Sequence, residues 1–199
     1  MIGLGNLPDE ALQHVLSFLP LQEAVQTCVL AQRWRYLWRS MSTLRTTSGS
    51  QSKRITEQGF HDLNIFVNNF LLRRDCKIPL HLCDFLIYPP GSVYSTEDAA
   101  AQIREDHAAQ ISFWIQRALL CKAQILRVRH DNIDEYYLAL DNLRLSSQHL
   151  TTLELEYMWL ESGFLDRSNW TSPKTVRMKF CCIDSDGISS QSLKRADYD

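Results

Sequence analysis

The chain has 199 residues, of which 45% are apolar and 22% are charged, and its formal net charge is −2. This length suffices for one domain, or for a small module and a partial second domain, and the near-neutral charge gives no whole-chain case for nucleic-acid or membrane binding. No apolar run approaches the length that crosses a bilayer, and the first residues lack the pattern of a signal peptide. We therefore expect an intracellular protein, in the nucleus or the cytoplasm.

The first 42 residues predict three short helices. Pro8 suits the first helical turn, and the two acidic residues after it favour the positive end of the helix dipole. Apolar residues then recur at helical spacing until Pro20, which ends this helix. A second helix is expected over about 22–29 and a third over about 32–41, where two tryptophans repeat the helical spacing.

These helices carry more apolar surface than three short elements can bury among themselves, so the exposed remainder is expected to form a docking patch for a partner protein. Tryptophan and arginine are favoured interface anchors. Trp34 and Trp38 can equally pack inside the module, and we expect at least one of them to be structural. The candidate interface residues are Leu7, Pro8, Leu12, Val15, Leu16, Leu19, Pro20, Val29, Leu30, Arg33, Trp34 and Trp38.

Residues 43–57 predict a linker, because Ser, Thr, Gly, Gln and basic residues dominate them. No acidic residue occurs from Ala24 to Thr56, whereas arginine and lysine recur there. These charges are either solvated positions or a basic strip that would speed encounter with an acidic partner.

The remaining residues, 58–199, predict helices near 58–74 and 99–121 and a recurring pattern, apolar-x-x-apolar-x-apolar. This pattern is the strand core of a leucine-rich repeat. Its copies centre on residues 85, 126, 153, 176 and 196, and the last three spacings of 27, 23 and 20 lie in the repeat range. Because short apolar runs are ambiguous, ordinary strands of an unrelated α/β domain are the alternative.

No catalytic signature is present, because the chain lacks a Gly-rich phosphate loop, a Gly-x-Ser-x-Gly elbow and a His-Glu-x-x-His motif. Cys76, His81 and Cys83 come nearest to a metal cluster, but a second ligand pair is missing. The six cysteines show no disulfide spacing and are expected to be free thiols. We therefore predict a non-catalytic protein without a metal or cofactor; a small enzyme built on a Cys/His pair is the unfavoured alternative.

Residues 7–41 resemble an F-box, and closely the plant type. The matching segments are Leu7-Pro8-Asp9-Glu10, Val15-Leu16-Ser17-Phe18-Leu19-Pro20 and Arg33-Trp34-Arg35-Tyr36-Leu37-Trp38. Ala31 stands where the family usually has serine, which removes a possible helix cap. Further on, the segment 147–155 resembles the plant class of F-box proteins with leucine-rich repeats, whose members usually run longer. The chain is thus expected to be a short or truncated member of that class.

The resemblance implies an α+β fold, with a three-helix F-box over 1–42, a linker over 43–57 and a short, irregular, leucine-rich-repeat-like α/β solenoid over 58–199. It also implies a substrate receptor of an SCF ubiquitin ligase. Such a receptor docks on a Skp-type adaptor, which links it to a cullin, and holds a target protein near the loaded ubiquitin carrier, which is catalysis by proximity. A non-degradative scaffold protein with a vestigial repeat domain is the alternative. The sequence does not identify the target.

Overall fold

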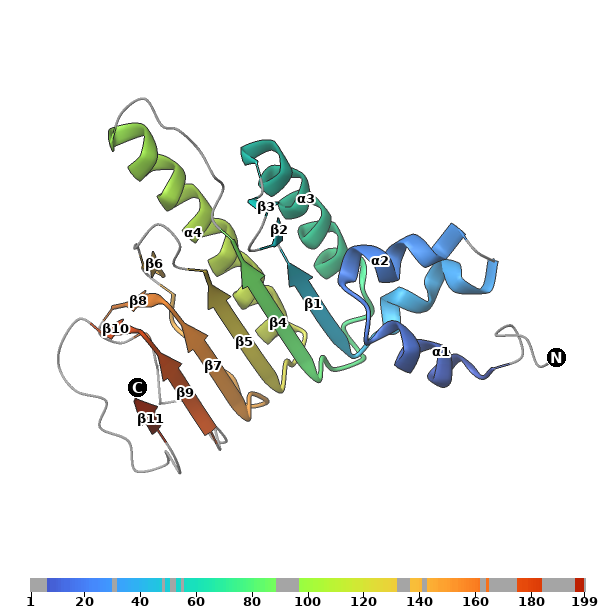
Figure 1. Cartoon of the computed structure of the whole chain (residues 1–199). Coiled ribbons are helices and arrows are strands. Elements are labelled where there is room, and N and C mark those ends of the chain that lie inside the picture. The colour runs from blue at the N-terminus through green and yellow to red at the C-terminus, as the bar shows by residue number, and fades with distance from the viewer. Residues whose placement is uncertain are drawn as a thin grey trace.

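The computed structural model has a helical module at the N-terminus, followed by a six-stranded sheet with two long helices on one face (Figure 1). This mixture of helices and strands agrees with the expected α+β class. The residues described are 7–29, 32–47, 49–50, 53–54, 56–88, 97–131, 137–140, 143–161, 164, 175–183 and 196–198.

The N-terminal module consists of four short helical elements: α1 (Asp9–Leu16), α2 (Leu21–Gln26), η2 (Thr27–Val29) and η3 (Gln32–Ser40). The third helix, expected over about 32–41, is η3, and it is a 3₁₀-helix. Its buried side chains, Trp34 and Leu37, lie three residues apart. A turn of three residues keeps both on the same inward edge, which favours the tighter helix.

The linker expected over 43–57 is wrong for its first five residues, which form strand β1 (Thr43–Thr47). β1 runs parallel to β4 (Leu82–Ile87), and its Leu44 and Thr46 side chains are buried. Threonine is β-branched and therefore fits a strand although it is polar, so the polar composition of this segment concealed the strand. Two further strands, β2 (Gly49–Ser50) and β3 (Lys53–Arg54), pair antiparallel with each other.

The large sheet has the order β1-β4-β5-β7-β9-β11, and all neighbouring strands are parallel. Each strand between β1 and β11 therefore pairs with the strand before it and the strand after it in this series. The remaining strands of this sheet are β5 (Ile125–His130), β7 (Thr152–Glu156), β9 (Thr175–Lys179) and β11 (Ala196–Tyr198). A smaller parallel sheet has the order β10-β8-β6, with strands Cys182–Ile183, Met158–Leu160 and Leu138–Ala139.

The strand register aligns most of the predicted pattern. Leu126 lies opposite Leu153, Leu153 opposite Val176, and Val176 opposite Ala196. On β4, however, Cys83 rather than the expected Phe85 lies opposite Leu126. This segment has apolar residues both at the predicted positions of the pattern and at positions two residues earlier. The sequence therefore matches the pattern in either alignment.

The sheet also contains a copy of the pattern that the sequence did not reveal. Leu44 lies opposite Cys83, so Met41, Leu44 and Thr46 form a copy before the first predicted one. All three side chains are buried. The polar Thr46 at its last position hid this copy.

Two helices cover one face of the sheet: α3 (Glu57–Arg73) and α4 (Glu97–Leu120) (Figure 1). The Thr56 hydroxyl caps α3 by accepting a hydrogen bond from the Gly59 backbone N–H at 3.0 Å. Trp114 of α4 is fully buried, with its ring centroid 6.0 Å from that of Phe60 on α3 and 5.7 Å from that of Phe85 on β4. This aromatic cluster therefore joins both helices to the sheet.

A buried histidine links the two helices. His107 of α4 has its Nε2 atom 3.3 Å from Oε2 of Glu57 on α3, and its ring centroid lies 4.0 Å from that of Phe60. Burial lowers the pKa of His107 below its usual value, although Glu57 opposes this shift. The unfolded chain therefore binds a proton more readily than the folded chain does.

We expect stability to fall as the pH drops through about 6.5, the ordinary pKa of histidine, because protons then favour the unfolded state. The His107→Gln variant should lose this part of the pH dependence. The measurement is the thermal midpoint of both proteins at about pH 7.5 and about pH 5.5, on either side of that value. An equal acid-induced drop in both proteins would contradict the assignment to His107.

Candidate adaptor-binding surface

The N-terminal module has a small core of its own. This core consists of Leu12, Leu16, Ala24, Trp34, Leu37 and Met41, with Leu7, Leu19 and Trp38 packed at its edge. Leu12 and Leu16 are fully buried, and Trp34 is 8% exposed. These three residues belong to the predicted interface; in this structure they pack inside the module, which leaves little or none of their surface exposed.

Trp38 joins the module to the rest of the chain. Its ring centroid lies 5.4 Å from that of Phe70 on α3, and its indole N–H donates to the backbone carbonyl of Arg35 at 3.0 Å. Leu21 of α2 is buried in the main core between helices and sheet, and the Asp75 backbone N–H donates to the Arg39 carbonyl at 3.0 Å. The module thus shares packed side chains and a backbone hydrogen bond with the rest of the chain.

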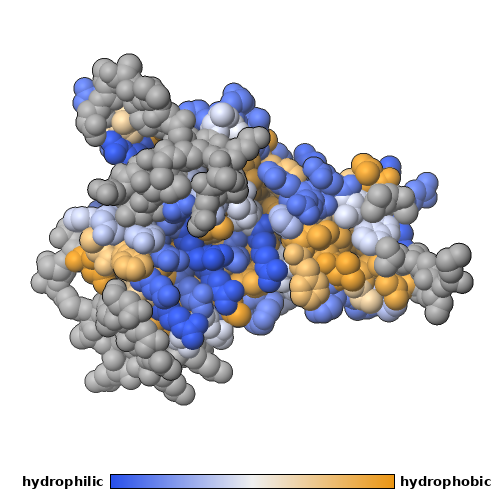
Figure 2. Space-filling model, in the orientation of Figure 1, coloured by the Kyte–Doolittle hydropathy of each residue, from blue (hydrophilic) through white to orange (hydrophobic). Residues whose placement is uncertain are grey.

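Several large apolar side chains of the module remain exposed. Val15 is 44% exposed, Phe18 63%, Val29 83% and Tyr36 58%. Figure 2 shows apolar side chains gathered at this end of the molecule, over the N-terminal helices. These four residues are called the apolar patch below.

The sequence predicted the apolar patch in part. Val15 and Val29 belong to the predicted interface and are exposed, as are the predicted Pro8 and Pro20; Leu30 lies outside the described residues. Phe18 and Tyr36 were missed. Phe18 does not share the helical spacing of the buried stripe, and an apolar residue off that stripe is the signal that could have found it.

Arg33, another predicted interface residue, is engaged within the module. Its Nε atom donates to Oδ1 of Asp9 at 2.7 Å, which ties η3 to the start of α1. The two ends of the module are also linked by Gln13, whose side-chain amide donates to the Ser40 hydroxyl at 2.9 Å. Since the Arg33 and Asp9 side chains are both substantially exposed, their ion pair contributes little stability but fixes the geometry of this surface.

The face of the sheet opposite the helices carries charged residues, and Figure 2 shows strongly hydrophilic side chains over the strands. The central row of this face is Arg45, Asp84, Arg127, Glu154 and Arg177, each opposite the next on neighbouring strands. The sign of the charge therefore alternates from strand to strand. We call this face the open face.

Ion pairs run along the open face. Glu154 lies between two arginines, with Oε2 2.7 Å from Nε of Arg127 and Oε1 2.9 Å from Nη1 of Arg177. The Arg127 contact is ionic, since its N–H does not have hydrogen-bond geometry. Asp84 accepts a hydrogen bond from Nη2 of Arg129 at 2.8 Å. The sequence did not predict these pairs, because they depend on the strand register.

The Glu154→Gln variant should lower the thermal midpoint by about 1–4 °C, because it removes a charge shared by two arginines on a partly exposed surface. Thermal unfolding followed by circular dichroism measures the change. High salt should reduce the difference from the unsubstituted protein. Glu156→Gln on the same strand is the control, since Glu156 makes no ion pair with the described residues; equal effects of the two substitutions would contradict the prediction.

The described residues provide neither a metal site nor a membrane span. No group of three or more His, Cys, Asp or Glu side chains there is placed to hold a metal ion. In the same part of the chain, no helix combines the length and the apolar character needed to cross a membrane.

Comparison with known proteins identifies the N-terminal module. Residues 4–46 match the F-box domain. An F-box/LRR-repeat protein of Arabidopsis thaliana is 65% identical over 34 residues, which are 17% of this chain and 9% of that protein. An FBD-associated F-box protein of the same plant is 37% identical over 41% of this chain and 17% of its own length.

Similarity also extends beyond the module. A putative FBD-associated F-box protein of Arabidopsis thaliana is 26% identical over 97% of this chain, and the match covers 46% of that protein. The chain thus spans less than half the length of these relatives. No solved structure matches it. The N-terminal module thus matches the F-box domain, and the chain is similar to F-box proteins of a plant.

Proposed function

We propose that this chain is a substrate-receptor subunit of an SCF-type ubiquitin ligase, acting in the nucleus or the cytoplasm. In this proposal the F-box docks on a Skp-type adaptor, and the adaptor links the chain to a cullin. The sheet holds a target protein so that a lysine of the target lies near the loaded ubiquitin carrier. The observation that carries the proposal is the apolar patch on a module that matches the F-box domain.

The chemistry of the apolar patch supports adaptor docking. When a partner covers exposed apolar side chains, the complex is stabilised by about 25 cal/mol per Å² of apolar surface buried. Val15 and Phe18 lie three residues apart at the end of α1, so one partner surface can cover both. The buried Leu12 and Leu16 then support this surface from below instead of touching the adaptor.

The shared packing between module and sheet supports the receptor role. Leu21 and Trp38 both pack against the main core, so the sheet is held in a defined position relative to the F-box. An adaptor bound to the module would thereby fix where a target on the sheet lies. Rate enhancement by proximity requires such fixed geometry.

We further propose that the large sheet is a short leucine-rich-repeat-like solenoid and that its open face is the target-binding surface. The aligned positions from Leu44 to Ala196 support this reading, because each copy of the pattern adds one parallel strand. The open face offers alternating charges on neighbouring strands, whereas α3 and α4 occupy the other face. Its charged groups would select a target through complementary charge more than through apolar area.

The adaptor-binding part is tested by co-purification of the full chain with a Skp-type adaptor, followed by a titration that gives the dissociation constant. Absence of a complex would overturn the proposal. Removing residues 1–42 is unsuitable as a control, because it would take Leu21 and Met41 away from buried positions. A variant with charged residues in the apolar patch is the better comparison, since it leaves both cores intact.

The target-binding part is tested by affinity capture from cells with the proteasome blocked, using the full chain and the patch variant in parallel. Partners lost with the patch variant include the adaptor, and partners retained by both are candidate targets. A candidate must then be ubiquitinated by the reconstituted ligase. Adaptor binding without ubiquitination of any retained partner would favour the non-degradative scaffold instead.

A further inference from the structure

Three thiols surround a buried arginine where the loop after α3 meets the end of α4. Arg74 is only 4% exposed, and its Nη2 atom donates to the Ile78 carbonyl at 2.8 Å. Its Nε and Nη1 atoms have no hydrogen-bond partner among the described residues. Burial lowers the pKa of Arg74, and the nearby thiols Cys121, Cys83 and Cys76 oppose that shift. The nearby Asp75 carboxylate also opposes it, so the guanidinium is enclosed by three thiols and one carboxylate.

Two of these thiols are already in contact. The Sγ atoms of Cys76 and Cys121 lie 3.3 Å apart, and Cys76 is exposed whereas Cys121 is buried. Backbone hydrogen bonds hold the two segments together, because the Leu80 N–H donates to the Cys121 carbonyl at 3.1 Å and the Gln124 N–H donates to the Leu80 carbonyl at 2.9 Å. A disulfide of about 2.05 Å therefore requires only a small movement of the sulfur atoms.

We propose that Cys76 and Cys121 form a reversible disulfide when the protein meets hydrogen peroxide, which makes this pair a redox modification site. The Cys76 thiolate attacks one peroxide oxygen, the O–O bond breaks, and the products are a sulfenic acid on Cys76 and hydroxide, which takes up a proton to give water. The Cys121 sulfur then attacks the Cys76 sulfur and displaces a second water. Two thiols and one peroxide thus give one disulfide and two waters, with two electrons passing from sulfur to oxygen.

The surroundings assign the two roles. Cys76 is the exposed thiol of the pair, so it is the one that dissolved peroxide reaches first. Burial raises the pKa of Cys121 to about 11, with a further contribution from Cys76, so this thiol reacts slowly with free peroxide. Cys83 is fully buried, and burial strongly raises its pKa, so it is protected from peroxide.

The bridge would stiffen the junction between the F-box and the sheet. Asp75, next to Cys76, donates its backbone N–H to the Arg39 carbonyl of η3 at 3.0 Å. The disulfide would tie this same loop to the end of α4 and close a loop between positions 45 residues apart. The expected result is a thermal midpoint raised by about 5–10 °C, because the cross-link restricts the unfolded chain.

Peptide mass spectrometry of the full chain tests the proposal. Trypsin cleaves after Arg74, Lys77, Arg117 and Lys122, which places Cys76 in peptide 75–77 and Cys121 in peptide 118–122, each with a single cysteine. After stoichiometric peroxide, these two peptides should appear joined, with the loss of two hydrogens, and dithiothreitol should separate them. Joined peptides at the same yield from protein oxidised in urea, or a sulfinic acid on Cys76 without joined peptides, would overturn the proposal.

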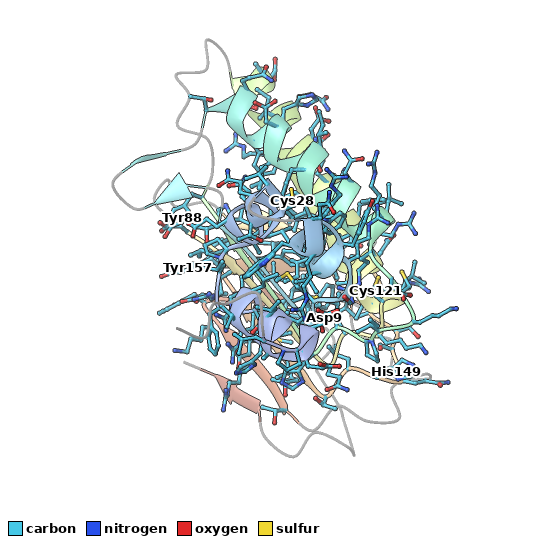
Figure 3. All side chains as sticks on the ribbon, turned by 90° about the vertical axis from the view of Figure 1, so that its right-hand side faces the viewer. Asp9, Cys28, Tyr88, Cys121, His149 and Tyr157 are labelled. Carbon is cyan, nitrogen blue, oxygen red and sulfur yellow. The ribbon has the colours of Figure 1, made fainter. Side chains whose placement is uncertain are left out.

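Variants sharpen the test. Cys121→Ser should leave a sulfenic acid on Cys76 that a dimedone probe traps, and it should abolish the rise in thermal midpoint; Cys121→Ala is the second variant in case serine disturbs the buried position. Cys28→Ser is the control and should form the bridge normally, since Cys28 lies apart from Cys121 (Figure 3). Failure of adaptor binding would leave these results unchanged, so they test the redox site independently of the proposed function.

Discussion

Replacing Trp114 with alanine is expected to lower the free energy of unfolding by about 3–5 kcal/mol. The side chain is fully buried between Phe60 and Phe85, and its indole N–H donates to the Asn64 side-chain carbonyl at 3.0 Å. Alanine would leave a large cavity at the place where both helices meet the sheet. It would also remove one of the two donors to the Asn64 side-chain oxygen, which would keep its hydrogen bond from the Asn68 side-chain amide at 3.1 Å. Chemical denaturation followed by circular dichroism measures the loss.

The neighbouring Phe113→Ala variant is the matched control for this prediction. Phe113 is exposed, and the Arg117 guanidinium carbon lies 5.3 Å from its ring centroid at the surface. Its loss should cost less than about 1 kcal/mol, because few buried contacts are lost. Similar losses for the two variants would mean that Trp114 does not occupy the centre of the core.

The second large effect is expected on adaptor affinity. The double variant Val15→Asp/Phe18→Asp should weaken binding to a Skp-type adaptor by about 100-fold, because it places two charges in the apolar patch. Both side chains are exposed, so the thermal midpoint of the free protein should change by no more than about 2 °C. Isothermal titration calorimetry with the purified adaptor gives the affinity, and a thermal scan verifies the fold.

The matched control carries the same charges on the same kind of residue elsewhere. Ile65 and Leu72 of α3 are exposed apolar side chains outside the F-box, so Ile65→Asp/Leu72→Asp should bind the adaptor normally. Leu16→Ala is the complementary case, because this residue is fully buried and its loss should destabilise the module by about 2–5 kcal/mol. Unchanged affinity in the patch variant would move the adaptor contact to another surface.

The sequence predicted the elements whose spacing reflects burial. The apolar stripe of α3 and the aligned pattern on β5, β7 and β9 were expected, because a periodic run of apolar residues records which face packs inward. The strand β1 was missed because its Thr46 is a polar residue in a buried position. Local composition shows that this residue is polar, whereas its burial results from the position of β1 in the sheet.

The candidate site was harder to predict than the fold. Apolar spacing identified Leu12, Leu16 and Trp34 as a set, but the same spacing describes a residue that packs inward and a residue that binds a partner. Only the packing of the module shows that these three residues are buried whereas Val15 and Phe18 are exposed. The ion pairs of Glu154 likewise depend on register between strands 20 to 30 residues apart, which spacing within one strand does not contain.

The strand order has a consequence for how the chain unfolds. Every strand of the large sheet between β1 and β11 rests on the strand before it and the strand after it, so the cooperativity of this sheet is a nearest-neighbour property. Opening can therefore begin at an edge and spread inward one strand at a time. β1 forms one edge, and the neighbouring Leu21 of the F-box packs into the same core. A ligand that clamps the F-box would oppose opening from that edge, so amide-hydrogen exchange should slow most at β1 and progressively less toward β9.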